Sequence, residues 1–145
     1  MSFAPTSRSH SAAQSYAKVG VETGVAAADP HRLILMLFDG ALLAVAKAGS
    51  AMEQKKIAEK GQVISHAIDI IANGLKASLN FSAGDELANR LAALYDYMCN
   101  RLLHANLKND PAALNEVGRL LAELRSAWAE IAQDPAVASS SKAAA

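Results

Sequence analysis

Residues 29–45 carry more apolar side chains than one face of a helix can hold. Asp29 is a favourable N-cap, and Pro30 suits the first helical position because its missing N–H needs no partner there. Six apolar residues follow in succession at positions 33–38. Since successive side chains of a helix are about 100° apart, these six point all round its axis. The segment therefore predicts a helix with two apolar faces.

The first apolar face has the spacing of an ordinary core stripe, and a second stripe lies on another side of the helix. This second stripe consists of Ile34, Leu35, Phe38, Leu42 and Val45. One interpretation is a helix at the centre of the fold, whose neighbours cover Ile34 and Phe38. Because each helix of a four-helix bundle normally keeps one solvated side, Leu35, Leu42 and Val45 are better explained by a groove for an amphipathic partner helix or by a dimer face. We take all five as candidate partner-binding residues.

The composition favours a helical domain without a basic surface. A chain of 145 residues indicates one domain, and alanine, the best helix former, is abundant while aromatic residues make up only 5%. The 14 basic and 14 acidic residues cancel, which argues against a nucleic-acid partner. A net charge of zero also removes one defence against self-association, so a weak homo-oligomer stays open.

Cysteine usage and hydropathy favour the cytoplasm. Cys99 is the single cysteine, so it has no internal disulfide partner and suits a reducing compartment. The N-terminal residues lack the basic and apolar regions of a secretory signal. Asp39 and Lys47 interrupt the most apolar segment before it reaches the length that a membrane span needs. We therefore expect a cytoplasmic protein with no membrane insertion.

The apolar period predicts four helices, near residues 30–53, 55–79, 85–107 and 111–133. Turn-forming residues at 80–85 separate the second from the third, and Asp110-Pro111 repeats the start signal of the first helix. Short connections favour antiparallel neighbours, so the expected fold is an all-α, up-down-up-down four-helix bundle with a short N-terminal helical arm. We expect residues 1–15 to be disordered, 16–28 to form the arm and linker, 29–134 to form the bundle and 135–145 to form a flexible tail.

The sequence offers no convincing catalytic, cofactor or metal site. A di-metal bundle needs Glu-x-x-His pairs, and no glutamate here is followed by a histidine three residues on. Ser65, His66 and Asp69 resemble a triad only on paper, because their side chains diverge on one helix. His66 also lacks the lysine and glycine that usually follow a phosphoacceptor histidine. We expect a protein that is not an enzyme.

An ordered set of motifs resembles the flagellin export chaperone family, FliS. The motifs span residues 16–131 and run in the family's order: Tyr16; Asp29-Pro30-x-x-Leu33-Ile34-x-Met36-Leu37-Phe38-Asp39-Gly40-Ala41; Ile68-x-Ile70-Ile71-x-x-x-Leu75-x-x-x-Leu79; Leu87-Ala88-x-x-Leu91-x-x-Leu94-Tyr95-x-Tyr97-Met98; Leu103-x-Ala105-Asn106 followed by Asp110; and Leu124-Arg125-x-Ala127-Trp128. The chain departs from the family at two places. Phe38 replaces the usual tyrosine, and Gly84-Asp85 replaces a common Gly-Gly pair.

The resemblance implies a non-enzymatic cytoplasmic chaperone built as an antiparallel helical bundle. Members of the family bind the C-terminal segment of newly made flagellin, prevent its premature polymerisation and deliver it to the cytoplasmic domain of the export gate, FlhA. Members have also been linked to an anti-sigma factor. No nucleotide or other cofactor is implied. The alternative function is a helical homodimerisation or adaptor module without chaperone activity.

A lone aromatic anchor lies on a glycine-containing tether ahead of the first long helix. We expect the arm around Tyr16 and Val19 to fold over the apolar surface in the free protein and, once displaced, to contact the export gate. The alternative is that Tyr16 packs permanently on the bundle.

Overall fold

A computed structural model describes residues 29–81 and 85–131 of the chain. The expectations for residues 1–15, for the arm at 16–28 and for the tail at 135–145 fall outside the described residues.

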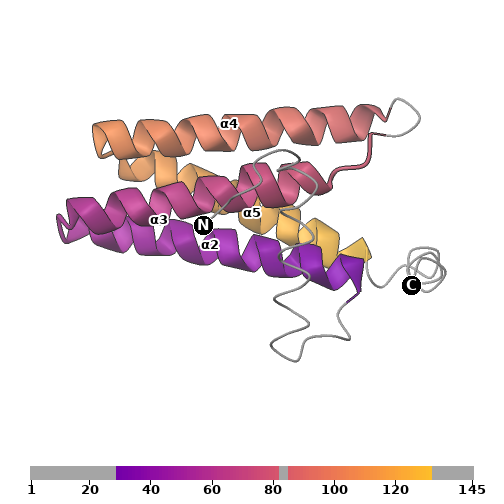
Figure 1. Cartoon of the computed structure of the whole chain (residues 1–145), viewed down its shortest axis with the longest axis horizontal. Helices are drawn as coiled ribbons and strands as arrows, with labels where there is room; N and C mark the ends of the chain where they lie inside the picture. The colour runs from indigo at the N-terminus through magenta and orange to yellow at the C-terminus, as the bar shows by residue number, and fades with distance from the viewer. Residues whose placement is uncertain (1–28, 82–84, 132–145) are drawn as a thin grey trace, which may run out of the picture.

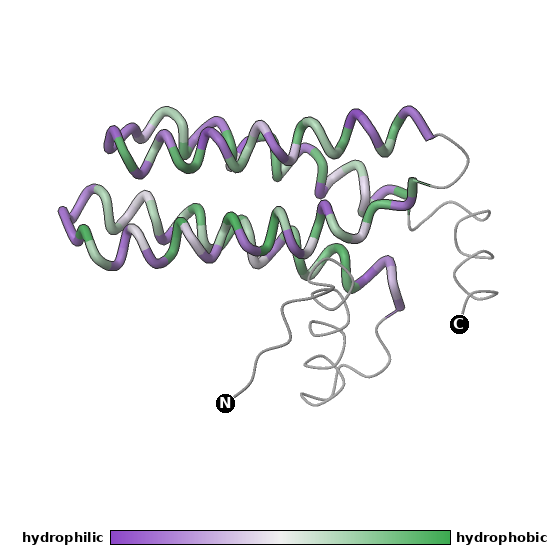
Figure 2. Tube along the Cα trace, turned by 45° about the horizontal axis from the view of Figure 1, so that its top comes forward, coloured by the Kyte–Doolittle hydropathy of each residue, from purple (hydrophilic) through white to green (hydrophobic). Residues whose placement is uncertain are grey.

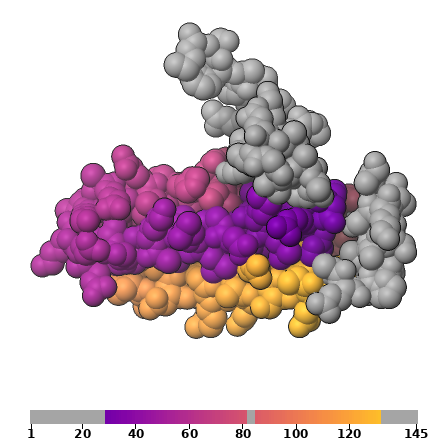
Figure 3. All heavy atoms as spheres, turned by 90° about the horizontal axis from the view of Figure 1, so that it is seen from below, coloured from indigo at the N-terminus to yellow at the C-terminus, as the bar shows by residue number. Residues whose placement is uncertain are grey.

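The described residues form a four-helix bundle without strands, as the sequence predicts. Its helices are α2 (Pro30–Glu53), α3 (Ile57–Asp69), α4 (Glu86–Lys108) and α5 (Pro111–Ile131). Consecutive helices run in opposite directions along the long axis (Figure 1). Viewed from one side, α2 lies between α3 and α5 (Figure 3), and it packs against both along its length. The all-α, up-down-up-down architecture is confirmed.

Aspartate side chains cap the starts of three helices. The Asp29 carboxylate accepts a hydrogen bond of 2.8 Å from the Arg32 N–H, so Pro30 begins α2 as expected. Asp85 accepts from the N–H groups of Leu87 and Ala88 at the start of α4. Asp110 accepts from the N–H of Ala112 at the start of α5, at 3.0 Å. These caps satisfy backbone donors that a helix N-terminus otherwise leaves free.

Apolar and polar residues alternate along every helix (Figure 2), and the apolar ones meet in one continuous core. Two helical glycines face other segments within this core. A β-carbon at Gly40 of α2 would touch Cδ1 of Ile70 at 3.4 Å, and one at Gly118 of α5 would touch Cγ1 of Val45 at 3.7 Å, both ordinary packing distances. The largest fully buried side chains come from α3 and its continuation and from α4 and α5, whereas the fully buried residues of α2 are alanines. These large side chains are Ile64, Ile71, Leu75, Met98, Leu102, Val117 and Leu121.

The second predicted helix differs from expectation in its start and its winding. α3 begins at Ile57, after a turn in which Lys55 takes a φ of 59°, and continues as a π-helix, η1 (Ile70–Leu75), and a 3₁₀ turn, η2 (Lys76–Ser78). Within the π turn the adjacent residues Ile70 and Ile71 are both buried in the core.

The expectation about membrane spans also needs correction. By length and composition alone, α2 is apolar enough to cross a membrane, despite Asp39 and Lys47. No other described helix meets these criteria. Only a third of its most apolar window is buried in the bundle. The same helix carries buried residues from His31 to Ala51 and packs against two neighbours. It is therefore a helix of the bundle, and part of its apolar surface stays uncovered by the other helices.

Candidate partner-binding groove

An apolar groove opens at the end of the bundle where α2 and α4 begin and α5 ends. It has a volume of about 250 Å³ and carries no charged side chain in its lining. We call it the terminal groove. Its lining comes from α2, the η1–η2 segment, α4 and α5: Ile34, Phe38, Leu75, Ser78, Leu79, Leu87, Leu91, Tyr95, Leu124, Ala127, Trp128 and Ile131.

The terminal groove has a buried floor and an exposed apolar rim. Phe38, Leu75 and Tyr95 are each at least 96% buried and belong to the bundle core. Leu87 at the rim is 62% exposed, and Ile131 is 39% exposed. Exposed leucine and isoleucine beside an apolar hollow are typical of a site for the apolar face of a partner segment.

The lining contains three polar side-chain groups, of which two are already paired. Ser78 Oγ donates to the carbonyl of Gly74 at 2.6 Å, and Trp128 Nε1 donates to the carbonyl of His31 at 2.9 Å. The Tyr95 hydroxyl bonds to no group among the described residues. Because no fully buried side-chain oxygen or nitrogen in that part of the chain lacks a partner, this hydroxyl retains some solvent access. The phenol, neutral near pH 7 like any tyrosine, is a donor there, and burial raises the pKa of Tyr95 further, to about 12.

His31 and Trp128 fix one wall of the terminal groove. Their rings stack with centroids 4.8 Å apart and planes 8° from parallel. His31 Nε2 lies 2.5 Å from the carbonyl oxygen of Trp128, and since a carbonyl only accepts, this nitrogen carries the proton. The indole donates in return to the carbonyl of His31. The first turn of α2 is thereby tied to the last turns of α5.

An ion pair joins the same two helices about two turns further along α2 and about one turn back along α5. Arg125 Nε donates to Asp39 Oδ1 at 2.5 Å, and the carboxylate raises the pKa of the guanidinium. Both side chains are exposed, so the pair adds little to the free energy of unfolding. Its main effect is on the position of α5 relative to α2.

The five residues of the second stripe occupy different environments in the structure. Ile34 and Phe38 line the terminal groove, and Ile34 and Leu42 are half-buried against the core. Leu35 is half-buried. The expectation that Val45 lies outside the bundle core is wrong: it is 6% exposed, because α5 packs over it, with Gly118 opposite its side chain. Tyr16 and Val19 fall outside the described residues.

Apart from Ile34 and Phe38, the sequence did not indicate which residues form the terminal groove. Leu75, Leu79, Leu87 and Leu91 stand in the family motifs, but only the fold brings them together at the open end of the bundle. One usable signal was present, since Tyr95 places a hydroxyl on an otherwise apolar helix face.

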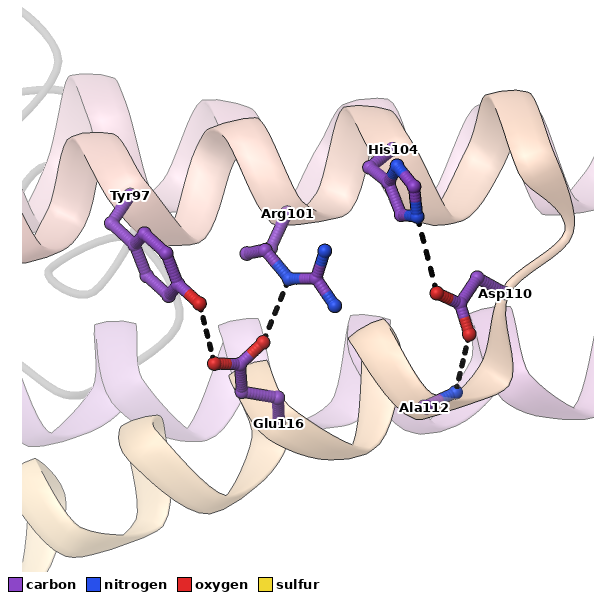
Figure 4. A network of polar contacts seen from close by, with 6 residues as sticks. All are labelled: Tyr97, Arg101, His104, Asp110, Ala112 and Glu116. Atoms are coloured by element: carbon purple, nitrogen blue, oxygen red, sulfur yellow. Dashed lines mark hydrogen bonds and ion pairs between the residues drawn. The ribbon is translucent and has the colours of Figure 1, made fainter.

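A separate polar network joins α4 to α5 further along the bundle (Figure 4). Glu116 accepts hydrogen bonds from the Tyr97 hydroxyl at 2.6 Å and from Arg101 Nε at 2.7 Å, which lower the pKa of its carboxyl. His104 Nε2 lies 3.1 Å from Asp110 Oδ2. Each group here has a partner within the network. Among the described residues there is also no cluster of three metal-binding side chains.

Comparison with known proteins decides the family. The family of the flagellar protein FliS matches residues 12–135. This chain belongs to the FliS family. Relatives named flagellar secretion chaperone FliS include proteins from three bacteria. The one from Salmonella typhimurium is 50% identical over 118 residues, covering 81% of this chain and 87% of the relative. The one from Escherichia coli is 44% identical over 124 residues, covering 86% and 91%.

The third relative, from Bacillus subtilis, is 36% identical over 112 residues, covering 77% of this chain and 82% of its own. The matched FliS region includes every residue that lines the terminal groove. The motif resemblance to FliS is thus confirmed, and FliS is a family of chaperones rather than a class of enzymes.

Proposed function

We propose that this FliS protein is a cytoplasmic export chaperone for flagellin. It binds the C-terminal segment of newly made flagellin, keeps that segment from polymerising early and delivers the complex to the cytoplasmic domain of the export gate, FlhA. The observation that carries this proposal is the uncharged apolar terminal groove, which four helical segments build and which has an exposed leucine at its rim. Relatives named flagellar secretion chaperone support the class of activity.

The groove suits a segment that is disordered alone and helical when bound. The apolar face of an amphipathic helix gains about 25 cal/mol for each Å² removed from water. The ordering of a flexible segment subtracts from this gain and keeps the complex reversible. Since the lining holds no charge, selection rests on shape and on the spacing of apolar side chains rather than on ion pairs. Release needs no nucleotide, only competition at the gate.

Residues of the second stripe enter the proposal in different ways. Ile34 and Phe38 contact flagellin inside the terminal groove. Leu35 and Leu42 extend this surface along α2, beside Met36 and Leu43, which are both exposed. Val45 acts from the core, where it holds α5 against α2.

The N-terminal arm is proposed as a cover for the same surface. The support for this proposal is the attachment point: Pro30 begins α2 and Ile34 lines the groove, so the chain that carries Tyr16 and Val19 joins the bundle about one helical turn from the groove. Its displacement by flagellin would make Tyr16 available to the gate. Deletion of residues 1–20 should tighten flagellin binding and increase self-association. An unchanged affinity and an unchanged oligomeric state would leave Tyr16 without a covering role.

Calorimetric titration tests the proposal directly. The full-length protein is titrated with a synthetic peptide of the C-terminal segment of flagellin, and a saturable signal with one-to-one stoichiometry is expected. Absence of binding would reject the chaperone function. An anti-sigma factor is a second expected partner and is tested in the same way.

The alternative is a homodimerisation or adaptor module. Three apolar side chains of α3 and α4 favour it, because they are between 55% and 77% exposed and lie outside the terminal groove: Ile57, Leu103 and Leu107. Sedimentation equilibrium distinguishes the two. A stable dimer that does not bind the flagellin peptide supports the module, and a monomer that binds it supports the chaperone.

A further inference from the structure

Within the described residues, the Tyr95 hydroxyl is the one polar side-chain group of the terminal groove that is not paired with another group of the protein. The other two, on Ser78 and Trp128, donate to backbone carbonyls of the bundle itself. Tyr95 is only 4% exposed as a residue, but its hydroxyl keeps some contact with solvent and bonds to no described group. A hydroxyl that bonds to no other part of the bundle contributes little to the fold, and phenylalanine would fill the same space.

We propose that the Tyr95 hydroxyl is the specificity-determining group of this groove, and that it donates a hydrogen bond to a neutral carbonyl oxygen of the bound segment. This inference rests on the proposed function, because the bound segment is the C-terminal part of flagellin. The hydroxyl thereby selects for a segment that places one acceptor against the groove wall, in addition to apolar side chains.

The surroundings of Tyr95 decide the chemistry of the acceptor. No cation lines the terminal groove, so a carboxylate held there would have no compensating charge. A neutral carbonyl oxygen meets no such penalty. Because the phenol is protonated near neutral pH, the hydroxyl acts as the donor and the segment supplies the acceptor. The carbonyl can belong to the backbone or to an asparagine or glutamine side chain of the segment.

Tyr97 provides a matched control on the same helix. It follows Tyr95 by two residues, is 43% exposed and does not belong to the groove lining. Its hydroxyl already donates to Glu116. Removal of the Tyr97 hydroxyl therefore removes a bond within the bundle, whereas removal of the Tyr95 hydroxyl removes only a bond to the partner.

The experiment compares Tyr95→Phe with Tyr97→Phe by calorimetric titration against the flagellin C-terminal peptide and by thermal unfolding. We expect Tyr95→Phe to weaken binding about tenfold while the Tm stays the same or rises, since one hydrogen bond to the partner is lost. We expect Tyr97→Phe to bind like the wild type. Wild-type affinity in Tyr95→Phe overturns the inference and leaves the proposed function intact. A wild-type protein that fails to bind the peptide overturns both.

A second arm identifies the source of the carbonyl. Each asparagine or glutamine of the peptide is replaced in turn by leucine or methionine, and the affinities of wild type and Tyr95→Phe are compared as double-mutant cycles. A replacement whose effect vanishes in Tyr95→Phe identifies a side-chain amide as the acceptor. If every replacement acts equally on both proteins while Tyr95→Phe still weakens binding, the acceptor is a backbone carbonyl. A Tm loss in Tyr95→Phe larger than in Tyr97→Phe would show that the hydroxyl serves the fold, and would overturn the inference.

Discussion

His31 and Trp128 hold each other by a ring stack and two reciprocal hydrogen bonds, although 97 residues separate them in the sequence. They tie the first turn of α2 to the end of α5. Because Trp128 also lines the terminal groove, this pair sets the position of one groove wall. A stability change at His31 should therefore also appear in partner binding.

His31→Ala removes the ring stack and the bond to the carbonyl of Trp128. The free energy of unfolding should fall by about 1–3 kcal/mol. Urea unfolding measures the change, and the fluorescence of Trp128, the single tryptophan, reports the loss of the stacked environment. His66→Ala is the control, since His66 is exposed on α3. An equal loss of stability in both variants would contradict the role of the pair.

Two glycines of α2 should respond in opposite ways to a larger side chain. Nothing lies within 4 Å of a β-carbon at Gly49, so Gly49→Ala should stabilise the protein by about 0.5–1 kcal/mol through helix propensity. Gly40 faces Ile70 at 3.4 Å, so Gly40→Val should destabilise it by about 1–3 kcal/mol through overpacking. Thermal unfolding checks both signs, and stabilisation by Gly40→Val would show that α2 and η1 are less closely packed than described.

Some features of these helices could be predicted from the sequence, and others could not. Caps and apolar periods predicted the start of α2 at Pro30 and the order and direction of all four helices, because those signals lie within each helix. The same signals placed Val45 on an open face, since nothing within α2 reveals that α5 covers it. The terminal groove was missed for a related reason: its lining residues come from four segments, and only the tertiary fold brings them together.

Lys60 is buried, and its side chain should stabilise the C-terminal end of α4. Its ammonium group donates to the carbonyl of Asn106 at 3.0 Å and to the side-chain oxygen of Asn109, the left-handed residue that follows α4. Lys60→Met keeps most of the aliphatic stem but leaves these acceptors without their donor. We expect a loss of about 1–3 kcal/mol in unfolding free energy. Lys56→Met, at an exposed position one turn earlier, should have little effect, and hydrogen exchange at the end of α4 should separate the two variants.

The thiol of Cys99 should react slowly with thiol reagents. Burial raises its pKa from 9.0 to about 11, with a smaller contribution from Asp96. At pH 8 the folded protein should react with a thiol reagent on the order of 100 times more slowly than the urea-unfolded chain, because so little thiolate is present. Since the unfolded chain loses this proton first, the thiol's contribution to stability should fade as the pH rises from about 9 to about 11. Equal reaction rates in the folded and unfolded protein would contradict the burial of Cys99.

The central claim is that the terminal groove, rather than apolar surface in general, binds flagellin. The decisive measurement is calorimetric titration of the flagellin C-terminal peptide into Leu87→Asp and Leu107→Asp, two exposed leucines of α4. Leu87 is at the groove rim, and Leu107 is 77% exposed near the other end of the helix. Leu87→Asp should weaken binding at least about tenfold with little change in Tm, because a charge enters an apolar contact. Leu107→Asp should bind like the wild type. Wild-type binding by Leu87→Asp together with weakened binding by Leu107→Asp would contradict the account.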